Sequence, residues 1–154
     1  KMRNGNPFRR EFWGQIGWNG FELGTEGGFN KNNKSSYLAS YRYTFLGLVG
    51  KLGLIGYMPQ YQDLTLKINL PTSHAGEFSL VGIEGTSKID IFDSGKPPSE
   101  WTFTDEGQDL SLKTGLGLIG LTHRITLNEK ISLRQYISGG SHPTTLKPAP
   151  PSRC

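Results

Sequence analysis

Ser36-Tyr-Leu-Ala-Ser-Tyr-Arg-Tyr-Thr-Phe45 is the stretch that decides the fold. Large or apolar side chains fill its odd-numbered positions, Tyr37, Ala39, Tyr41, Tyr43 and Phe45. Ser40, Arg42 and Thr44 alternate with them. Successive side chains of a β-strand leave opposite faces, so a period of two with this aromatic content predicts a strand. One face of that strand is apolar and the other polar.

The same alternation recurs outward from this stretch, whereas no segment has a sustained helical period. We therefore predict an all-β chain, an antiparallel up-and-down meander of about six strands with almost no helix. The predicted strands are Glu11–Gly28, Ser36–Phe45, Tyr61–Leu70, Glu77–Gly85 (prolonged by Lys88–Phe92), Leu110–Ile125 and a last strand from Ile131. The apolar parity changes near Asn19–Gly20, which predicts a bulge or bend within one long strand. Both faces of Glu77–Gly85 are partly apolar, so its faces are not assigned.

The connections between these strands alternate in length. Phe29–Ser35, Pro71–Gly76 and Leu127–Lys130 are short, whereas Leu46–Gln60 and Ser87–Asp109 are long. Outer-membrane β-barrels have short periplasmic turns and long extracellular loops, with aromatic girdles at both membrane interfaces. Aromatic residues also lie near the predicted strand ends: Tyr37, Phe45, Tyr57, Tyr61, Phe78, Trp101 and Phe103. We therefore predict that the meander is part of a transmembrane β-barrel, with the short turns periplasmic and the long loops outside.

Composition agrees with such strands. The hydrophobic fraction of 34% is low, and glycine is frequent at 21 of 154 residues. A barrel strand needs only every second residue to be apolar, so the bulk average stays moderate. No apolar run approaches the roughly 20 residues of a membrane-spanning helix. The net charge of +4 is spread along the chain, and Cys154 is the single cysteine, so neither a disulfide nor a Cys/His metal site is predicted.

Three regions are predicted from the distribution of turn formers and alternation. Residues 1–10 are a basic linker, residues 11–140 form the strands, and residues 141–154 are a disordered proline-rich tail. The tail holds Pro143, Pro148, Pro150 and Pro151, which are unsuited to a β-ladder. Residues 1–10 also begin without a methionine, so we expect a segment of a longer protein.

No motif in the chain predicts a reaction. Gly115-Leu-Gly-Leu-Ile-Gly120 matches a dinucleotide-binding pattern but lies inside an alternating strand, where that chemistry needs a strand-to-helix turn. The acidic residues form no defined pair, and the tyrosines beside Arg42 lie on the opposite face from it, which disfavours nucleic acid as a partner. We predict no catalytic, cofactor-binding or metal-binding residues, and the substrate-binding residues stay unknown. Six polar residues are expected to face the lumen, where they contact the plug or a ligand or form structural polar ladders: Ser40, Arg42, Asp63, Lys67, Lys113 and Arg134.

Several segments together resemble the TonB-dependent outer-membrane receptors, especially the large forms of the Bacteroidetes group. They are Lys1-Met-Arg-Asn-Gly-Asn6, Asn19-Gly-Phe-Glu-Leu-Gly-Thr-Glu26, Ser36-Tyr-Leu-Ala-Ser-Tyr-Arg-Tyr43, Tyr61-Gln-Asp-Leu64, Lys67-Ile-Asn-Leu-Pro71, Phe78-Ser-Leu-Val-Gly82 and Ser87-Lys-Ile-Asp90. In that family a plug domain fills a barrel of about 22 strands. The resemblance implies that the chain runs from the plug exit, at Arg3–Asn6, into the first barrel strands. It implies import of a scarce nutrient (an iron chelate, cobalamin or a glycan), driven through TonB, in the cell outer membrane.

The resemblance also implies the partners: outer-membrane lipid, the plug of the same parent chain, and the TonB complex through an N-terminal part that these residues lack. Six strands are too few for a closed barrel, because single-chain bacterial barrels begin at about eight. The alternative is a soluble β-sandwich that binds carbohydrate or protein, since alternation alone does not distinguish lipid from a core. A hydrolase is the least supported alternative, because no nucleophile and base are visible.

Overall fold

The protein is a single antiparallel sheet, described here from a computed structural model. The structure describes residues 2–29, 34–44, 46, 59–94, 96–101 and 108–148. The strands are β1 Glu11–Gly17, β2 Gly20–Gly28, β3 Ser36–Thr44, β4 Gln60–Pro71, β5 Glu77–Ile91, β6 Leu110–Asn128, β7 Ile131–Ser141 and β8 Thr144–Pro148. Within the described residues the one element outside the sheet is a short 3-10 turn, Pro98–Glu100. The predicted all-β antiparallel meander is confirmed, with eight strands in place of the predicted six or so.

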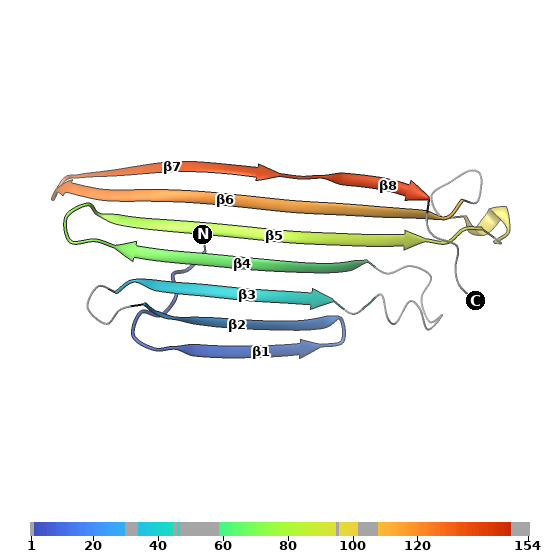
Figure 1. Cartoon of the computed structure of the whole chain (residues 1–154), viewed down its shortest axis with the longest axis horizontal. Helices are drawn as coiled ribbons and strands as arrows, with labels where there is room; N and C mark the ends of the chain where they lie inside the picture. Colours follow the sequence, from blue (N-terminus) through green and yellow to red (C-terminus); the bar gives the residue numbers. More distant parts are fainter. Residues whose placement is uncertain are drawn as a thin grey trace.

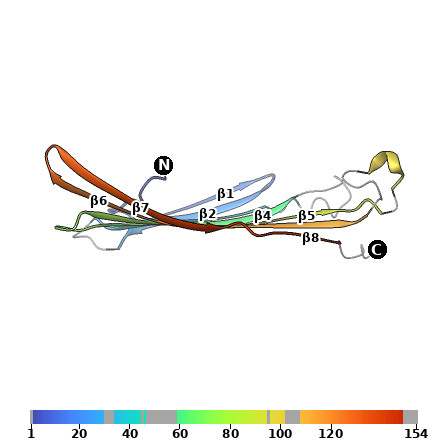
Figure 2. The same cartoon turned by 90° about the horizontal axis from the view of Figure 1, so that it is seen from above.

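The strands follow one another in chain order from β1 to β7, and each pairs antiparallel with the next (Figure 1). β8 pairs with β6 and continues the row of β7 after a break at His142 and Pro143. Seen from its edge, the sheet is one twisted layer (Figure 2). The sheet is not closed, because β1 lies at one edge and β7 with β8 at the other.

The predicted bend near Asn19–Gly20 is wrong, and a tight hairpin takes its place. β1 and β2 pair along their whole length, and Gly17 opposite Gly20 closes a two-residue turn. In this register Ile16 lies opposite Phe21, so an even-numbered residue of β1 shares a face with an odd-numbered residue of β2. The parity change in the sequence is therefore the signature of a hairpin, whose two turn residues are Trp18 and Asn19.

The expectation that the prolines keep residues 141–154 out of the sheet is wrong for Thr144–Pro148, which forms β8. Pro148 is the last residue of an edge strand, where its missing N–H interrupts no ladder. The carbonyl of Pro143 accepts a hydrogen bond from the Gly115 amide at 2.8 Å, which bridges the gap between β7 and β8. Residues 149–154 lie outside the described part of the chain.

The predicted long loops are only partly described. Residues 47–58 of the predicted loop Leu46–Gln60 lie outside the described residues. The second predicted loop, Ser87–Asp109, begins later, because β5 continues to Ile91 as the alternation at Lys88–Phe92 predicted. The first connection at this end of the sheet, the β1–β2 hairpin, is short, so the alternation of lengths does not extend to it.

Few large apolar side chains of this sheet are buried. Among the described residues only Leu38 and Ile91 are buried large apolar side chains, whereas nineteen large hydrophobic side chains are exposed. Eight positions along the strands are instead buried polar residues or glycines, such as Glu26, Lys67 and Asn69. A single layer leaves its apolar face without a protein partner.

Candidate functional site

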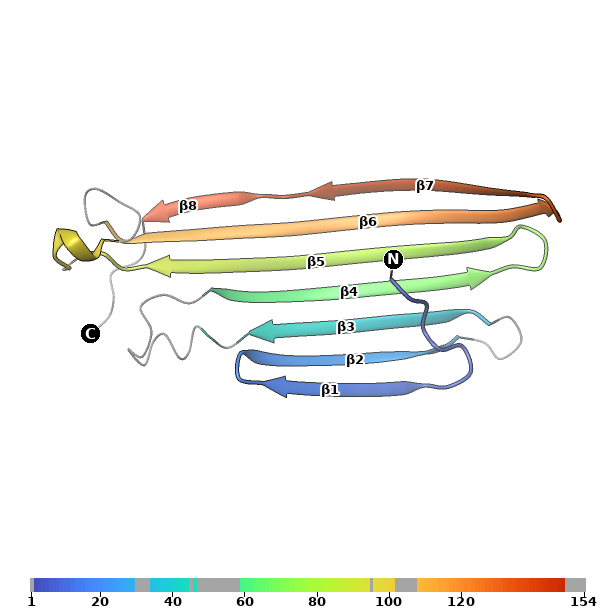
Figure 3. The same ribbon diagram turned by 180° about the vertical axis from the view of Figure 1, so that it is seen from behind.

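The two faces of the sheet differ in what lies on them. Residues 2–8 cross one face over β2, β3 and β4 (Figure 3), and we name this the covered face. It carries Glu26, Leu38 and Lys67, which lie opposite one another in the register. The other side is the open face, on which no described segment lies.

The open face carries an apolar band. Opposite Leu66 lie Ala39 and Gly82, and the same face carries Phe12, Leu23, Leu121 and Ile137. Twelve of the nineteen exposed apolar residues lie on this face: Phe12, Ile16, Leu23, Leu64, Leu66, Leu70, Ile119, Leu121, Leu127, Ile131, Leu133 and Ile137. The band contains neither Lys nor Asp between these positions, and it is interrupted by the pair His123 and Gln135 and borders Glu84, which lies opposite Leu64.

Aromatic rings close the band at both ends. Toward the long connections, the Phe21 ring packs against those of Tyr41 and Tyr43, with centroids 6.2 and 5.8 Å apart. The Tyr41 hydroxyl donates to Gln62 Oε1 at 3.0 Å, so the ring lies in the apolar band and its polar atom points to the band's edge.

Toward the short turns, Phe29 packs on Tyr37 and Phe78 stacks on His123 with centroids 4.4 Å apart. His123 Nε2 donates to the Ala75 carbonyl at 2.6 Å, which holds the imidazole beside the turn. Tyr37 and Phe78 thus lie where strand-end aromatics were predicted.

Tyr61 does not join these rings, because it projects from the covered face. Trp101 lies in the loop after β5, and Phe45, Tyr57 and Phe103 lie outside the described residues.

The band runs diagonally across the strands. On β3 it reaches Tyr43, but the residue opposite on β4 is Gln62, and the next ones in that row are Thr86 and Gly115. At the turn end, the band extends to Leu70 on β4 and as far as Leu127 on β6, well beyond the end of β3. Between β3 and β6 the band as a whole is therefore displaced toward the turns.

β5 and β6 reverse their amphipathic character along their length. In the half near the turns, which we name the turn half (Glu77–Leu80 and Ile119–Asn128), the apolar residues point to the open face. In the half near the loops, the loop half (Ile83–Ile91 and Leu110–Leu118), they point to the covered face. The loop half instead places Glu84, Thr86, Lys88, Asp90, Ser111 and Lys113 on the open face.

Glu26 anchors the N-terminal segment to the covered face. Its carboxylate is 4% exposed and accepts hydrogen bonds from Arg3 Nη2 at 3.0 Å and from the Asn6 amide at 3.1 Å, besides an ion pair with Arg3 Nη1. The hydrogen bonds that Arg3 donates to this carboxylate raise the pKa of its guanidinium. Buried carboxylates need such partners, and here residues 2–8 supply them.

Two further contacts hold the same segment. Lys67 Nζ, on β4, donates to the Met2 carbonyl at 2.6 Å. A Cβ at Gly5 would lie 1.9 Å from the Tyr37 carbonyl oxygen, and one at Gly28 would lie 2.3 Å from the Pro7 carbonyl oxygen. The segment therefore packs directly on the strand backbones of β2 and β3, where only glycine fits.

Five of the six polar residues expected to face the lumen share the covered face: Ser40, Arg42, Asp63, Lys67 and Arg134. Arg42 Nε donates to Asp63 Oδ2 at 2.8 Å, and its guanidinium lies 6.0 Å from the centroid of the Tyr61 ring. The prediction for Lys113 is wrong: it lies opposite Lys88, on the open face. The leucines beside Lys113 belong to the loop half, where the apolar side is reversed.

The loop after β5 is tied to the start of β6. Asp109 Oδ1 accepts from the Ser94 amide at 2.8 Å, and its Oδ2 accepts from the Ser94 hydroxyl at 2.6 Å. These two hydrogen bonds lower the pKa of Asp109 below its usual value of 3.8. The indole of Trp101 donates to the Lys96 carbonyl at 3.0 Å, so this loop also makes contacts within itself.

In the described ranges, no group of three or more His, Cys, Asp or Glu side chains is arranged to hold a metal ion. No helix in that part of the chain has the length and apolar character to cross a membrane. Comparison with protein-family models, with curated proteins and with solved structures finds no match to this chain. The functional argument therefore rests on the two faces of the sheet.

Proposed function

We propose that this sheet is part of the wall of a transmembrane β-barrel, with its open face toward lipid and its covered face toward the lumen. The observation that carries this proposal is the diagonal apolar band. Strands of membrane barrels are tilted by about 35–45°, so a band level with the membrane crosses successive strands at shifted positions. In a water-soluble sandwich, a second sheet would cover the apolar face, and the described residues form a single layer.

The aromatic clusters support the same placement. Barrels in outer membranes have aromatic girdles at both interfaces, because amphipathic rings favour the boundary between headgroups and acyl chains. Tyr41 with Phe21 marks one edge of the band here, and Tyr37 with Phe78 marks the other. The open sheet edges must pair in hydrocarbon, so the wall is completed by further strands or by further chains.

We infer in addition that the wall belongs to a TonB-dependent outer-membrane receptor that imports a scarce nutrient. The support is the segment resemblance together with residues 2–8, which lie on the lumen side as a plug exit would. Glu26 and Lys67 bind this segment, whereas Ser40, Arg42, Asp63 and Arg134 remain available to plug or ligand. Outer-membrane lipid, the plug and the TonB complex are the proposed partners, and the outer membrane is the proposed location.

Cysteine labelling of the intact protein in cells tests the placement and its orientation. In a Cys154→Ser background, Trp18→Cys lies in the β1–β2 hairpin and His74→Cys in the turn before β5. A membrane-impermeant maleimide added to whole cells is expected to label the first variant, and to label the second only after the outer membrane is opened.

Carbonate extraction of the same cells is the control for membrane integration. Recovery of the protein in the carbonate-soluble fraction, with both cysteines labelled equally, would contradict the barrel. Cooperative folding of the chain in buffer without detergent would support the soluble β-sandwich instead.

A further inference from the structure

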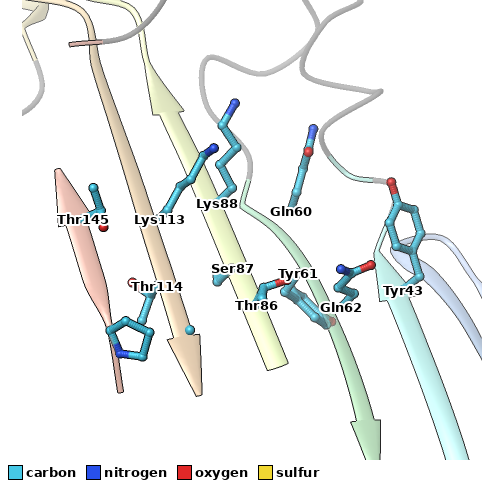
Figure 4. Close-up of a pocket in the computed structure, with 12 residues that line it drawn as sticks. Tyr43, Gln60, Tyr61, Gln62, Thr86, Ser87, Lys88, Lys113, Thr114 and Thr145 are labelled. Atoms are coloured by element: carbon cyan, nitrogen blue, oxygen red, sulfur yellow. The ribbon is translucent and has the colours of Figure 1, made fainter. Parts of the chain in front are cut away.

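A pocket that combines polar side chains with tyrosine and proline surface lies on the open face of the loop half, beyond the apolar band. Its volume is about 470 Å³, and Gln60, Gln62, Thr86, Lys88, Lys113 and Thr145 contribute side chains to its lining. These residues come from β4, β5, β6 and β8, and Figure 4 shows the Lys88 and Lys113 side chains next to one another and pointing the same way. Tyr43 of β3 also lines it, so the pocket is built from five strands of the sheet.

The two lysines are an unfavourable pair in the absence of an anion. Lys88 and Lys113 lie directly opposite one another in the register, and like charges in such pairs destabilise a sheet. Asp90 binds Lys88 at 2.5 Å and also attracts Lys113 electrostatically, although Lys113 itself forms no hydrogen bond or ion pair within the described residues. Lys147, opposite Ser111 on the same face, adds a third ammonium group. The cluster therefore carries an excess of positive charge.

The distance of the lysine cluster from the apolar band determines which anionic group the cluster can contact. On β6, Gly117 and Gly115 separate Lys113 from Ile119, the last apolar residue of the band on that strand. At about 3.4 Å per residue the lysine lies roughly 20 Å further along the strand, which strand tilt reduces to about 15 Å in height. Glu84 lies between the band and the lysines and disfavours phosphate close to the acyl chains. Lysine stems can reach back toward the membrane by several ångströms.

We propose that this pocket binds the phosphorylated sugar headgroup of a glycolipid in the outer leaflet. The proposal rests on the proposed placement of the open face in lipid. A phosphate at this height accepts charge-assisted hydrogen bonds from Lys88 and Lys113. Gln60, Gln62 and the threonine hydroxyls offer donors and acceptors to sugar hydroxyls. A simple phospholipid places its phosphate closer to the acyl chains than a headgroup with several sugars does, so the sugar-bearing lipid fits better.

Lipid retention by the intact protein tests this site. The protein is purified from outer membranes in a nonionic detergent, and the phosphorylated glycolipid bound per chain is counted by native mass spectrometry. Each lysine near an anionic surface contributes about a factor of five to the binding affinity. The double variant Lys88→Gln with Lys113→Gln is therefore expected to lower lipid retention by at least about fivefold. The matched control is Lys34→Gln with Lys130→Gln, which removes the same charge at the turn end and is expected to retain lipid like wild type.

The outcomes separate the two proposals. Equal retention by both double variants, in a protein that is still membrane-integrated after carbonate extraction, overturns the glycolipid site and leaves the barrel standing. Displacement of the lipid by excess inorganic phosphate, with phosphate binding lost in the Lys88/Lys113 variant, identifies a free-phosphate site and also overturns the proposal. A wild-type protein found in the carbonate-soluble fraction overturns the barrel and the lipid site together.

Discussion

The turn half and the loop half of β5 and β6 are built from the same two strands but present their apolar side chains to opposite sides. In the turn half, Leu80 and Leu121 lie on the open face, and Ser79 and Thr122 on the covered face. In the loop half, Ile83 and Leu118 lie on the covered face, whereas Glu84 lies on the open face. A continuous backbone therefore meets two environments.

The reversal of the apolar side indicates where the proposed membrane ends. A wall that only crosses a bilayer needs about 9–11 residues per strand, yet β5 has 15 and β6 has 19. The additional residues follow the pattern of a water-soluble sheet, with polar groups outside and apolar groups inside. The point of reversal, between Leu80 and Val81 on β5 and between Leu118 and Ile119 on β6, marks the proposed boundary of the lipid.

The largest expected effect comes from a charge in the band. Leu66→Arg on β4 puts a guanidinium at the centre of the apolar band and is expected to cost about 2–4 kcal/mol of folding free energy in a bilayer, whereas Thr86→Arg, on the same face of the loop half, costs about 0–1 kcal/mol. Urea titration of the protein in phospholipid vesicles measures both. Equal costs would contradict a boundary between the two positions.

The covered face is tested next, through the N-terminal segment. Gly5→Ala forces a Cβ against the Tyr37 carbonyl, so residues 2–8 are expected to leave the sheet and Arg3 to become accessible to trypsin. The rate of cleavage after Arg3 measures this, with an expected increase of tenfold or more, equivalent to about 1.4 kcal/mol. Asn4→Ala is the control, because the Asn4–Glu77 contact is 3.5 Å long and exposed. Unchanged cleavage in Gly5→Ala would show that the segment is not packed there.

The loop half offers a sharper contrast between adjacent residues. Leu112 is half-buried on the covered face and Lys113 is exposed on the open face. Leu112→Asn is expected to cost about 1–2 kcal/mol from lost apolar burial, whereas Lys113→Asn changes the free energy of unfolding by no more than about 0.5 kcal/mol. Denaturant unfolding compares the two. The reverse order would mean that the loop half keeps the orientation of the turn half.

The smallest effect concerns the pH dependence of the loop half. The pKa of Asp109 is lowered in the folded protein, so its bonds to Ser94 are fully present above the unfolded value of about 3.8 and are lost as the pH falls through the lower, folded pKa. Amide exchange at Ser94 is expected to stay slow at pH 5 and to accelerate only in stronger acid. Asp109→Asn keeps an acceptor but is expected to remove this pH dependence, and an unchanged profile in that variant would rule out Asp109 as its source.

Strand content could be predicted from the sequence, because alternation is local. Tyr37, Tyr41 and Tyr43 define β3 without any tertiary information, and β4 and β6 follow in the same way. The β1–β2 hairpin was also encoded, in the parity change that falls at its turn residues, Trp18 and Asn19. A parity change can arise from a bend within one strand or from a hairpin between two strands. The bend was predicted, and the structure has the hairpin.

Which residues of neighbouring strands share a face depends on the register of the strands. The sequence alone does not give that register. The prediction for Lys113 assumed that the leucines of Leu110–Leu118 continue the apolar face of β4. The signal against that assumption was present, since the apolar positions change parity between Leu80 and Val81 on β5 and between Leu118 and Ile119 on β6. The contacts of Arg3 and Lys67 join residues far apart in the chain, so no local pattern could have predicted them.

The unequal reach of the strands gives the proposed barrel a slanted rim. The β1–β2 hairpin stops level with Thr44, β4 begins one residue pair further out, and β5 and β6 continue to Ile91 and Leu110 (Figure 1). A mouth with this profile is low above β1 and high above β6. In the proposed barrel, a bulky solute that approaches along the cell surface would reach the interior by a shorter route over β1 and β2 than over the longer strands β5 and β6.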